Sequence, residues 1–315
     1  MQSTIRIGTR GSPLALRQTE EVRARLMAAH GLGQDAFETE IIKTTGDQVL
    51  DRPLAEIGGK ELFTKEIEQA LLEDRIDLAV HSTKDMPTEL PQGLVIACFL
   101  PREDVRDAFI SFKAKSFREL PQGARIGTAS LRRAAQALNR RPDLEVVPFR
   151  GNVQTRLRKL KDGEADATFL ALAGLKRLGL TDHVTSLVET AEMLPAVGQG
   201  AICIETRSDD DAVNVLLAAI HHADTADCVT CERAFLAALD GSCRTPIAGL
   251  AEIAGGDVAF RGQVLTPDGR EAEGIEARGP RGEAARIGHE AGAALKARLR
   301  PGFFADLENP ASPDR

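Results

Sequence analysis

The stretch RIGTRGSPLAL, residues 6–16, decides the predicted fold because a variant of it occurs twice in the chain. Residues 125–135 read RIGTASLRRAA, and in both copies a serine (Ser12, Ser130) follows a short apolar start and precedes a helix-like run. Serine is a good helix N-cap, and Pro13 suits the first position of a helix. The pattern predicts two units that each open with a strand, a short turn and a helix.

A second pair of segments supports this repeat. Residues 65–80 (KEIEQALLEDRIDLAV) and 155–170 (TRLRKLKDGEADATFL) each predict an amphipathic helix that runs into a buried strand. Beyond about residue 222 the pattern changes to a helix over 226–239, alternating strands such as 257–265, and a helix near 283–299. We therefore predict an α/β protein of three domains. They comprise residues 1–100 with 200–218, residues 105–195, and a small α+β domain over 222–315.

Composition narrows the possible functions. The 315 residues carry a formal net charge of -7, with no Trp or Tyr. An acidic surface disfavours nucleic acids and anionic membranes, and single-strand binders stack bases on aromatic rings that are scarce here. The N-terminus lacks a signal-peptide pattern, and no apolar run approaches the roughly 20 residues that span a bilayer. We expect a cytoplasmic protein that binds neither nucleic acid nor membrane.

Basic residues follow the predicted turns and helix starts. They are Arg10, Arg132, Arg133, Arg150 and Arg156. Helix N-termini attract anions, and the guanidinium group pairs with carboxylates in a bidentate manner. A cleft between the two units would suit a ligand with several carboxylates. The alternative for any single arginine is a solvated surface position.

The segment HSTKDMP, residues 81–87, follows the apolar strand predicted over 76–80. Catalytic groups of α/β proteins often lie just beyond strand ends, and Asp85 could accept hydrogen bonds from a ligand or stabilise a developing cation. A simple Lys-Asp turn before proline explains the segment equally well. His81 is equally compatible with a satisfied, half-buried histidine.

The cysteines offer one candidate nucleophile. Cys243 lies between small residues and Arg244, which favours an accessible thiolate, although an isolated cysteine is more often buried and inert. The Cys228 and Cys231 pair lacks further ligands for zinc and lies in a helical pattern, so we assign it to the core and predict no metal site. Residues 58–63, GGKELF, predict a mobile lid.

Many segments in the same order resemble the hydroxymethylbilane synthase (porphobilinogen deaminase) family from residue 6 to about 250. They include RIGTRGSPLALRQ, KTTGD, IGGKELFTKEIE, DLAVHSTKDMP, REDVRDAF, IGTASLRRAAQ, RGNVQTRLRKL, LAGLKRLGL, LPAVGQGA and GSCRTPIAG. The resemblance implies two lobes like those of type II periplasmic binding proteins, a third domain, and a monomer. It implies that four porphobilinogen molecules condense with loss of ammonia on a dipyrromethane primer, and that hydrolysis then releases hydroxymethylbilane.

The resemblance also assigns roles to residues. Asp85 corresponds to the catalytic aspartate, and Cys243 to the cysteine that carries the dipyrromethane cofactor through a thioether. The other positions implied for the cofactor are Lys84, Ser130, Arg132 and Arg133. Those implied for substrate are Arg10, Ser12, Lys60, Ser82, Arg150, Asn152 and Arg156.

Two other functions remain open at this point. A non-catalytic two-lobed protein that binds polycarboxylates would explain the arginines but gives Cys243 no role. An acyl-transfer enzyme would use Cys243 as nucleophile, but no histidine is evidently paired with it. Release of ammonia from porphobilinogen distinguishes the synthase from the binding protein, and reaction with acyl substrates distinguishes the two enzymes.

Overall fold

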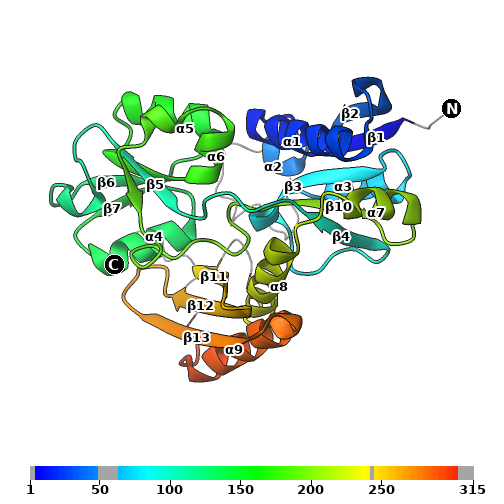
Figure 1. Cartoon of the computed structure of the whole chain (residues 1–315). Helices are drawn as coiled ribbons and strands as arrows, with labels where there is room; N and C mark the ends of the chain where they lie inside the picture. Colours follow the sequence, from blue (N-terminus) through cyan, green and yellow to red (C-terminus); the bar gives the residue numbers. More distant parts are fainter. Residues whose placement is uncertain (1–3, 49–62, 242–244, 304–315) are drawn as a thin grey trace.

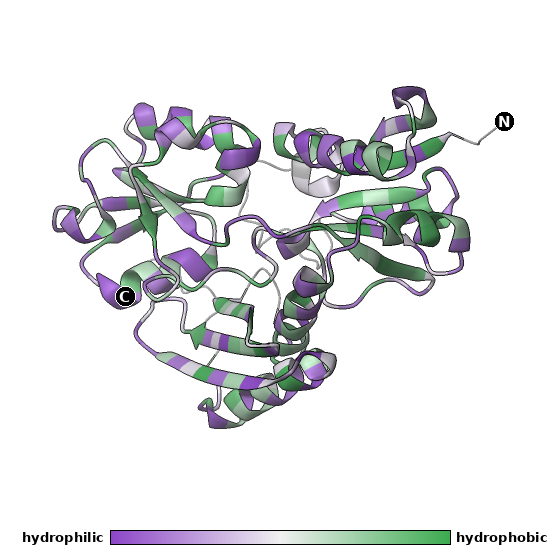
Figure 2. Cartoon of the chain, viewed as in Figure 1, coloured by the Kyte–Doolittle hydropathy of each residue, from purple (hydrophilic) through white to green (hydrophobic). Residues whose placement is uncertain are grey.

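The computed structural model describes residues 4–48, 63–241 and 245–303, which form two α/β lobes and a third, smaller unit (Figure 1). The lobes lie side by side, and the third unit lies against both. In Figure 2 hydrophobic residues run along the strands of the sheets, while the outer helices carry more polar residues. The predicted α/β class is confirmed. The domain limits stay a prediction.

The first lobe is built on a five-stranded sheet of order β2-β1-β3-β10-β4. Its strands are β1 (Ile5–Thr9), β2 (Phe37–Ile41), β3 (Leu78–Ser82), β4 (Leu94–Phe99) and β10 (Ile202–Arg207). Its helices are α1 (Pro13–His30), α2 (Thr45–Gln48), α3 (Lys65–Leu72) and α7 (Asp211–Ala218), with short turns η1 (Gln34–Ala36) and η2 (Thr83–Asp85). Strand β10 runs antiparallel to its neighbours. The chain therefore returns to this sheet after it has built the second lobe.

The second lobe repeats the same arrangement in the order β7-β6-β8-β5-β9. Its strands are β5 (Asp107–Ser111), β6 (Arg125–Gly127), β7 (Glu145–Val147), β8 (Ala167–Ala171) and β9 (Ser186–Val188). Its helices are α4 (Leu131–Arg140), α5 (Val153–Lys161) and α6 (Leu172–Arg177), with η3 (Phe117–Glu119) and η4 (Thr181–His183). Here β5 is antiparallel to β8 and β9, as β10 is to β3 and β4. The repeat predicted from the sequence is confirmed, and two crossovers, residues 100–106 and 189–201, join the lobes.

The repeated glycine has a packing reason in both lobes. A Cβ atom on Gly8 would lie 2.2 Å from Ile76 Cδ1, and one on Gly127 would lie 2.6 Å from the ring of Phe149. Each glycine sits in the strand that leads into the first α-helix of its lobe, β1 before α1 and β6 before α4. A large side chain thus fills the space above each strand and leaves no room for a methyl group.

The third unit packs two helices on a three-stranded antiparallel sheet. Its elements are α8 (Ala223–Ala238), β11 (Ile247–Ala254), β12 (Asp257–Leu265), β13 (Ala272–Pro280), η5 (Arg281–Glu283) and α9 (Ala284–Arg298). Cys228 and Cys231 lie in its hydrophobic core, so their assignment to the core is confirmed. Helix α8 begins three residues before the predicted start because His222 caps it, accepting a hydrogen bond from the Thr225 amide.

Candidate functional site

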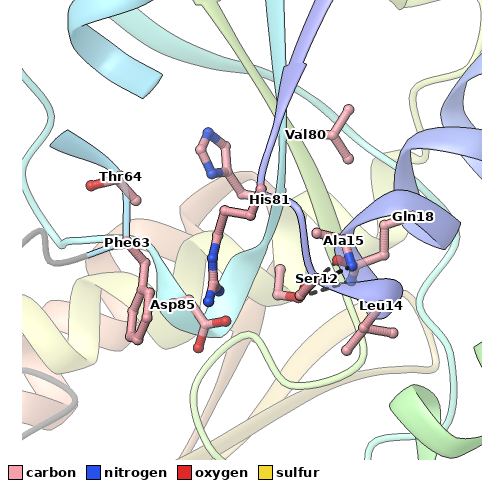
Figure 3. A pocket seen from close by; sticks show the side chains of 11 residues that line it. Ser12, Leu14, Ala15, Gln18, Phe63, Thr64, Val80, His81 and Asp85 are labelled. Carbon is pink, nitrogen blue, oxygen red and sulfur yellow. Dashed lines mark hydrogen bonds between the residues drawn. The ribbon is translucent and has the colours of Figure 1, made fainter. Parts of the chain in front are cut away.

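An open pocket lies where β3 ends and α1 begins. It is lined by Arg10, Ser12, Leu14, Ala15, Gln18, Phe63, Thr64, Val80, His81, Ser82 and Asp85. Figure 3 shows Phe63 and Asp85 on the side opposite Ser12 and Gln18. The end of a central strand and the N-terminus of a helix therefore form one wall each, which is where α/β proteins commonly bind ligands.

Asp85 is presented to this pocket by a tight turn. Residues Thr83–Asp85 form the 3-10 turn η2, closed by a hydrogen bond of 3.1 Å from the Met86 amide to the Thr83 carbonyl. Met86 is buried and anchors the turn, while Asp85 is exposed. The predicted local turn is real, and it leaves the carboxylate accessible to a ligand.

Lys84 precedes this carboxylate and lies among other charges. Burial lowers the pKa of Lys84, the nearby carboxylate of Asp85 opposes that shift, and the charge of Arg133 adds to it. Since Asp85 belongs to the first lobe and Arg133 to the second, both lobes contribute charge at this place. A cation here would gain by pairing with a ligand carboxylate.

His81 has a structural role in this arrangement. The strand predicted over 76–80 lies at Leu78–Ser82, so His81 is part of β3. Its Nε2 lies 3.1 Å from Glu205 Oε2, and both side chains are buried. Figure 3 shows its ring directed away from Asp85. The reading of His81 as a satisfied histidine is therefore favoured over a catalytic one.

Arg132 and Arg133 share a single buried carboxylate. Asp107 accepts hydrogen bonds of 2.7 Å from the Nη2 atoms of both arginines. Burial alone would raise the pKa of Asp107, but the two guanidinium charges hold it well below its usual range. The sequence predicted both arginines at a helix start, and the structure places them there in α4 but already paired.

Arg150 and Arg156 add positive charge beside this pair. Arg156 donates from Nε to the Gly151 carbonyl at 2.8 Å. Its pKa falls to about 10, chiefly through burial and then through the nearby charges of Arg133 and Arg150, while Asp85 opposes the shift. Arg150 has a buried Nη1 atom without a hydrogen-bond partner in the described part of the chain. Half-buried, mutually repelling cations are suited to an anionic ligand.

Three predicted polar residues cap helices. The side chains of Ser12, Ser130 and Asn152 accept from backbone amides three residues later, at 3.2, 3.4 and 2.8 Å. Ser82 is hydrogen-bonded to Gln18 at 2.8 Å. These side-chain bonds orient the turns, and the helix N-termini that they cap face the same region as the arginines.

Arg10 lies over an aromatic ring, 4.2 Å from the centroid of Phe63. Phe63, Gln18, Asp107 and Gln199 were absent from the predicted site. All four lie in segments that carry the family resemblance, namely IGGKELFTKEIE, RIGTRGSPLALRQ, REDVRDAF and LPAVGQGA, but none of them was assigned a role from the sequence. Cys243 and Lys60 lie outside the described residues, as does the predicted lid except for Phe63.

No helix in the described ranges is long and apolar enough to cross a membrane. Among those same residues, no group of His, Cys, Asp and Glu side chains is arranged to hold a metal ion.

Two models of one known family match this sequence. Residues 5–215 match the model described as "porphobilinogen deaminase, dipyromethane cofactor binding domain", and residues 226–297 match the C-terminal domain of the same enzyme. The chain belongs to the porphobilinogen deaminase family. A porphobilinogen deaminase of Paracoccus denitrificans is 61% identical over 303 residues, which are 96% of this chain and 97% of that protein.

Some solved structures of other proteins are more weakly similar to this member of the porphobilinogen deaminase family. A methionine-binding lipoprotein of Bacillus subtilis is 15% identical with a TM-score of 0.44, covering 71% of this chain and 93% of that one. A periplasmic substrate-binding protein of Coxiella burnetii is 14% identical with a TM-score of 0.43, covering 70% and 92%. Overlaps of this size carry no conclusion about fold, ligand or mechanism.

Proposed function

We propose that this chain is a hydroxymethylbilane synthase, a transferase that condenses four porphobilinogen molecules with loss of ammonia. Membership of the family over nearly the whole chain supports the activity. One observation supports this activity at the site itself. The exposed carboxylate of Asp85 lies near cations that come from both lobes. The substrate brings carboxylates and a pyrrole N–H, and these are the groups that such a site would bind.

The dipyrromethane cofactor fits the residues present. The Nε atom of Arg133 is buried without a partner among the described residues, and burial lowers the pKa of Lys84, with the charge of Arg133 adding to that shift. Carboxylates would satisfy these donors and offset the repulsion between the cations. We propose that Lys84, Ser130, Arg132 and Arg133 hold this group, and that Arg133 also meets carboxylates of the incoming porphobilinogen. When bound, the cofactor supplies the nucleophilic pyrrole carbon on which the chain grows.

Attachment to Cys243 is proposed partly by elimination. The chain has five cysteines, and the other four, Cys98, Cys203, Cys228 and Cys231, are buried. Burial raises the pKa of each of these four thiols, to about 12 for three of them and about 11 for Cys228. A thiol must ionise to form a thioether readily, so the four buried cysteines are poor candidates.

The negatively charged and positively charged residues of the site have different roles in the reaction. Asp85 accepts the pyrrole N–H hydrogen bonds, stabilises positive charge as ammonia leaves, and takes up the proton released when the new carbon–carbon bond forms. We propose that Arg10, Arg150 and Arg156 bind substrate carboxylates, with Ser12, Lys60, Ser82 and Asn152 around them. The turn η2 keeps the carboxylate of Asp85 at the end of β3 throughout, because buried Met86 anchors it.

The polycarboxylate-binding function makes a different prediction from the synthase. Incubation of the purified protein with porphobilinogen should release ammonia and yield hydroxymethylbilane. Intact mass should show an excess of two porphobilinogen units less two ammonias, and peptide mapping should place it on Cys243. Binding of porphobilinogen without ammonia release would instead identify a binding protein. An adduct on another cysteine would move the attachment site but leave the activity standing.

We further propose that the enzyme is a cytoplasmic monomer, which sedimentation and cell fractionation test.

A further inference from the structure

Asp107 is the buried carboxylate on which two of the predicted binding arginines converge. It has no exposed surface, and Arg132 and Arg133 are 4% and 5% exposed. It is the first residue of β5, directly after the crossover over residues 100–106. A carboxylate in this position neutralises only one of two adjacent guanidinium charges, so the cluster keeps a net positive charge.

The two arginines are not equivalent. Arg132 donates to Asp107 and also, from Nη1, to the Leu194 carbonyl at 2.8 Å, while its Nη2 lies 3.5 Å from Gln199 Oε1. Within the described residues, Arg133 makes one side-chain hydrogen bond, to Asp107. The Nε atoms of both arginines are buried without a partner there, so the difference lies in the terminal nitrogens. The protein therefore uses most of the Arg132 guanidinium group and leaves most of the Arg133 group for a ligand.

Arg133 is also the arginine that faces the other charges of the site. Its charge contributes to lowering the pKa of both Lys84 and Arg156, after the larger effect of burial. It is unfavourable to hold Arg133 close to these other cations unless a fixed anion offsets the repulsion. Asp107 is that anion, since it bonds Arg133 at 2.7 Å.

Asp107 is in turn fixed by the second crossover. Gln199 Nε2 donates to Asp107 Oδ1 at 3.0 Å and to the Val105 carbonyl at 2.7 Å. Gln199 belongs to the return segment that leads into β10, and Val105 to the outward one. The orientation of Asp107 thus depends on both segments that join the lobes.

We propose that Asp107 is a positioning residue, which orients Arg133 toward Lys84 and Arg156 with Arg132 as its support. A ligand carboxylate then meets one pre-oriented guanidinium group. This inference rests on the proposed function, since it names the part of the same site that receives pyrrole carboxylates. Asp107 touches the arginines and Gln199 but no reacting atom, so its loss should weaken binding more than it slows the chemistry.

Three variants of the full chain test the proposal. Asp107→Asn keeps the shape and removes the charge, whereas Asp107→Glu keeps the charge with one more methylene. Asp104→Asn is the matched control, because Asp104 lies in the same crossover and pairs with Arg106 at 2.8 Å. For Asp107→Asn we expect KM for porphobilinogen to rise about tenfold with kcat reduced less than about threefold. The fraction of purified protein carrying the covalent adduct, measured by intact mass, should also fall.

Asp107→Glu should recover part of the loss in KM and in adduct, and Asp104→Asn should match the wild type. Unchanged KM and adduct in folded Asp107→Asn would overturn the proposal. The proposal would also be overturned if a smaller folded fraction explained the whole change in KM and adduct. The same holds if Asp107→Glu changed KM and adduct more than Asp107→Asn does. If Asp107→Asn does not fold, Gln199→Met decides, because it removes the bond to Asp107. A KM raised about threefold supports the proposal and an unchanged KM refutes it. Failure of the wild type to release ammonia would refute the proposed function instead.

Discussion

The two lobes share a backbone plan but contribute different charged groups to the site. In the first lobe β3 ends in the turn that presents Asp85, whereas the equivalent β8 runs from Ala171 directly into helix α6. In the second lobe, helix α4 carries Arg132 and Arg133, while the equivalent α1 starts with Pro13 and Leu14. The duplicated fold supplies two similar turns, and side-chain changes make one lobe the source of the carboxylate and the other the main source of cations.

The common features of the lobes are the ones that set backbone position. Strands β1 and β6 each have a glycine under a large side chain, and the helices that follow them, α1 and α4, each have a serine N-cap. The features that differ are charged side chains, the exposed Asp85 in the first lobe and the buried Arg132 and Arg133 in the second. A repeat therefore predicts where a site lies better than it predicts which residues act there.

The largest effect should follow loss of the first lobe's carboxylate. Asp85→Ala should lower kcat by at least about 10²–10³-fold, since it removes the group that stabilises developing positive charge. Asp85 is exposed, so the thermal midpoint should stay near that of the wild type. Glu89→Ala, four residues further on and also exposed, is the control and should keep full activity. Near-normal turnover by Asp85→Ala would remove this residue from the mechanism.

The equivalent glycines should differ in how well they tolerate a methyl group. A Cβ on Gly127 would meet three atoms of the Phe149 ring within 2.9 Å, whereas on Gly8 the clash is with the end of the flexible Ile76 side chain. We expect Gly127→Ala to lower the free energy of unfolding by about 1–3 kcal/mol and Gly8→Ala by less. Gly282→Ala, which would meet nothing within 4 Å, is the control. Urea unfolding measures all three, and equal losses at Gly8 and Gly127 would contradict this reading.

Much of the fold could be predicted because the decisive signals are local. The paired RIGT segments, the serine caps and the helix–strand periodicity identified both lobes, and β12 matches its predicted bounds. The bounds of β3 were wrong by two residues because polar His81 and Ser82 continue the strand. A buried partner, Glu205, satisfies His81, and that partner is 124 positions away in the sequence.

The site was predicted as a set of residue types but not as a set of contacts. Arginines at turns indicated an anion site, yet nothing local shows that Arg132 and Arg133 share Asp107, 25 and 26 positions earlier. The pairing arises because β5 lies in the second sheet, two strands from the strand that leads into α4. Gln199 lies in the segment LPAVGQGA, but nothing in that segment shows that its side chain reaches Asp107.

The cations of the second lobe should make substrate binding weaken at high pH, an effect that the carboxylate of the first lobe does not produce. Because burial lowers the pKa of Arg156 to about 10, this group loses its proton, and with it an attractive charge, as pH rises through that value. We expect kcat/KM for porphobilinogen to be maintained below this range and to fall above it, by up to about tenfold. This alkaline limb, the fall in kcat/KM at high pH, should be absent in Arg156→Gln, which lacks the charge at every pH. Arg158→Gln is the control, since Arg158 is exposed on the same helix. An unchanged alkaline limb in Arg156→Gln would assign it to another group.

The smallest effect should come from the two serine caps. Ser12 accepts from the Ala15 amide at 3.2 Å, and Ser130 accepts from the Arg133 amide at 3.4 Å. Replacing either by alanine should cost about 1 kcal/mol of unfolding free energy, with Ser12→Ala the larger because its bond is shorter. The comparison sharpens when activity is measured as well. Ser130 caps the turn that bears Arg133, so Ser130→Ala should also raise KM, whereas Ser130→Thr keeps the hydroxyl and should restore it. An equal rise in KM for Ser130→Thr would mean that the site responds to the shape of this turn and not to the cap.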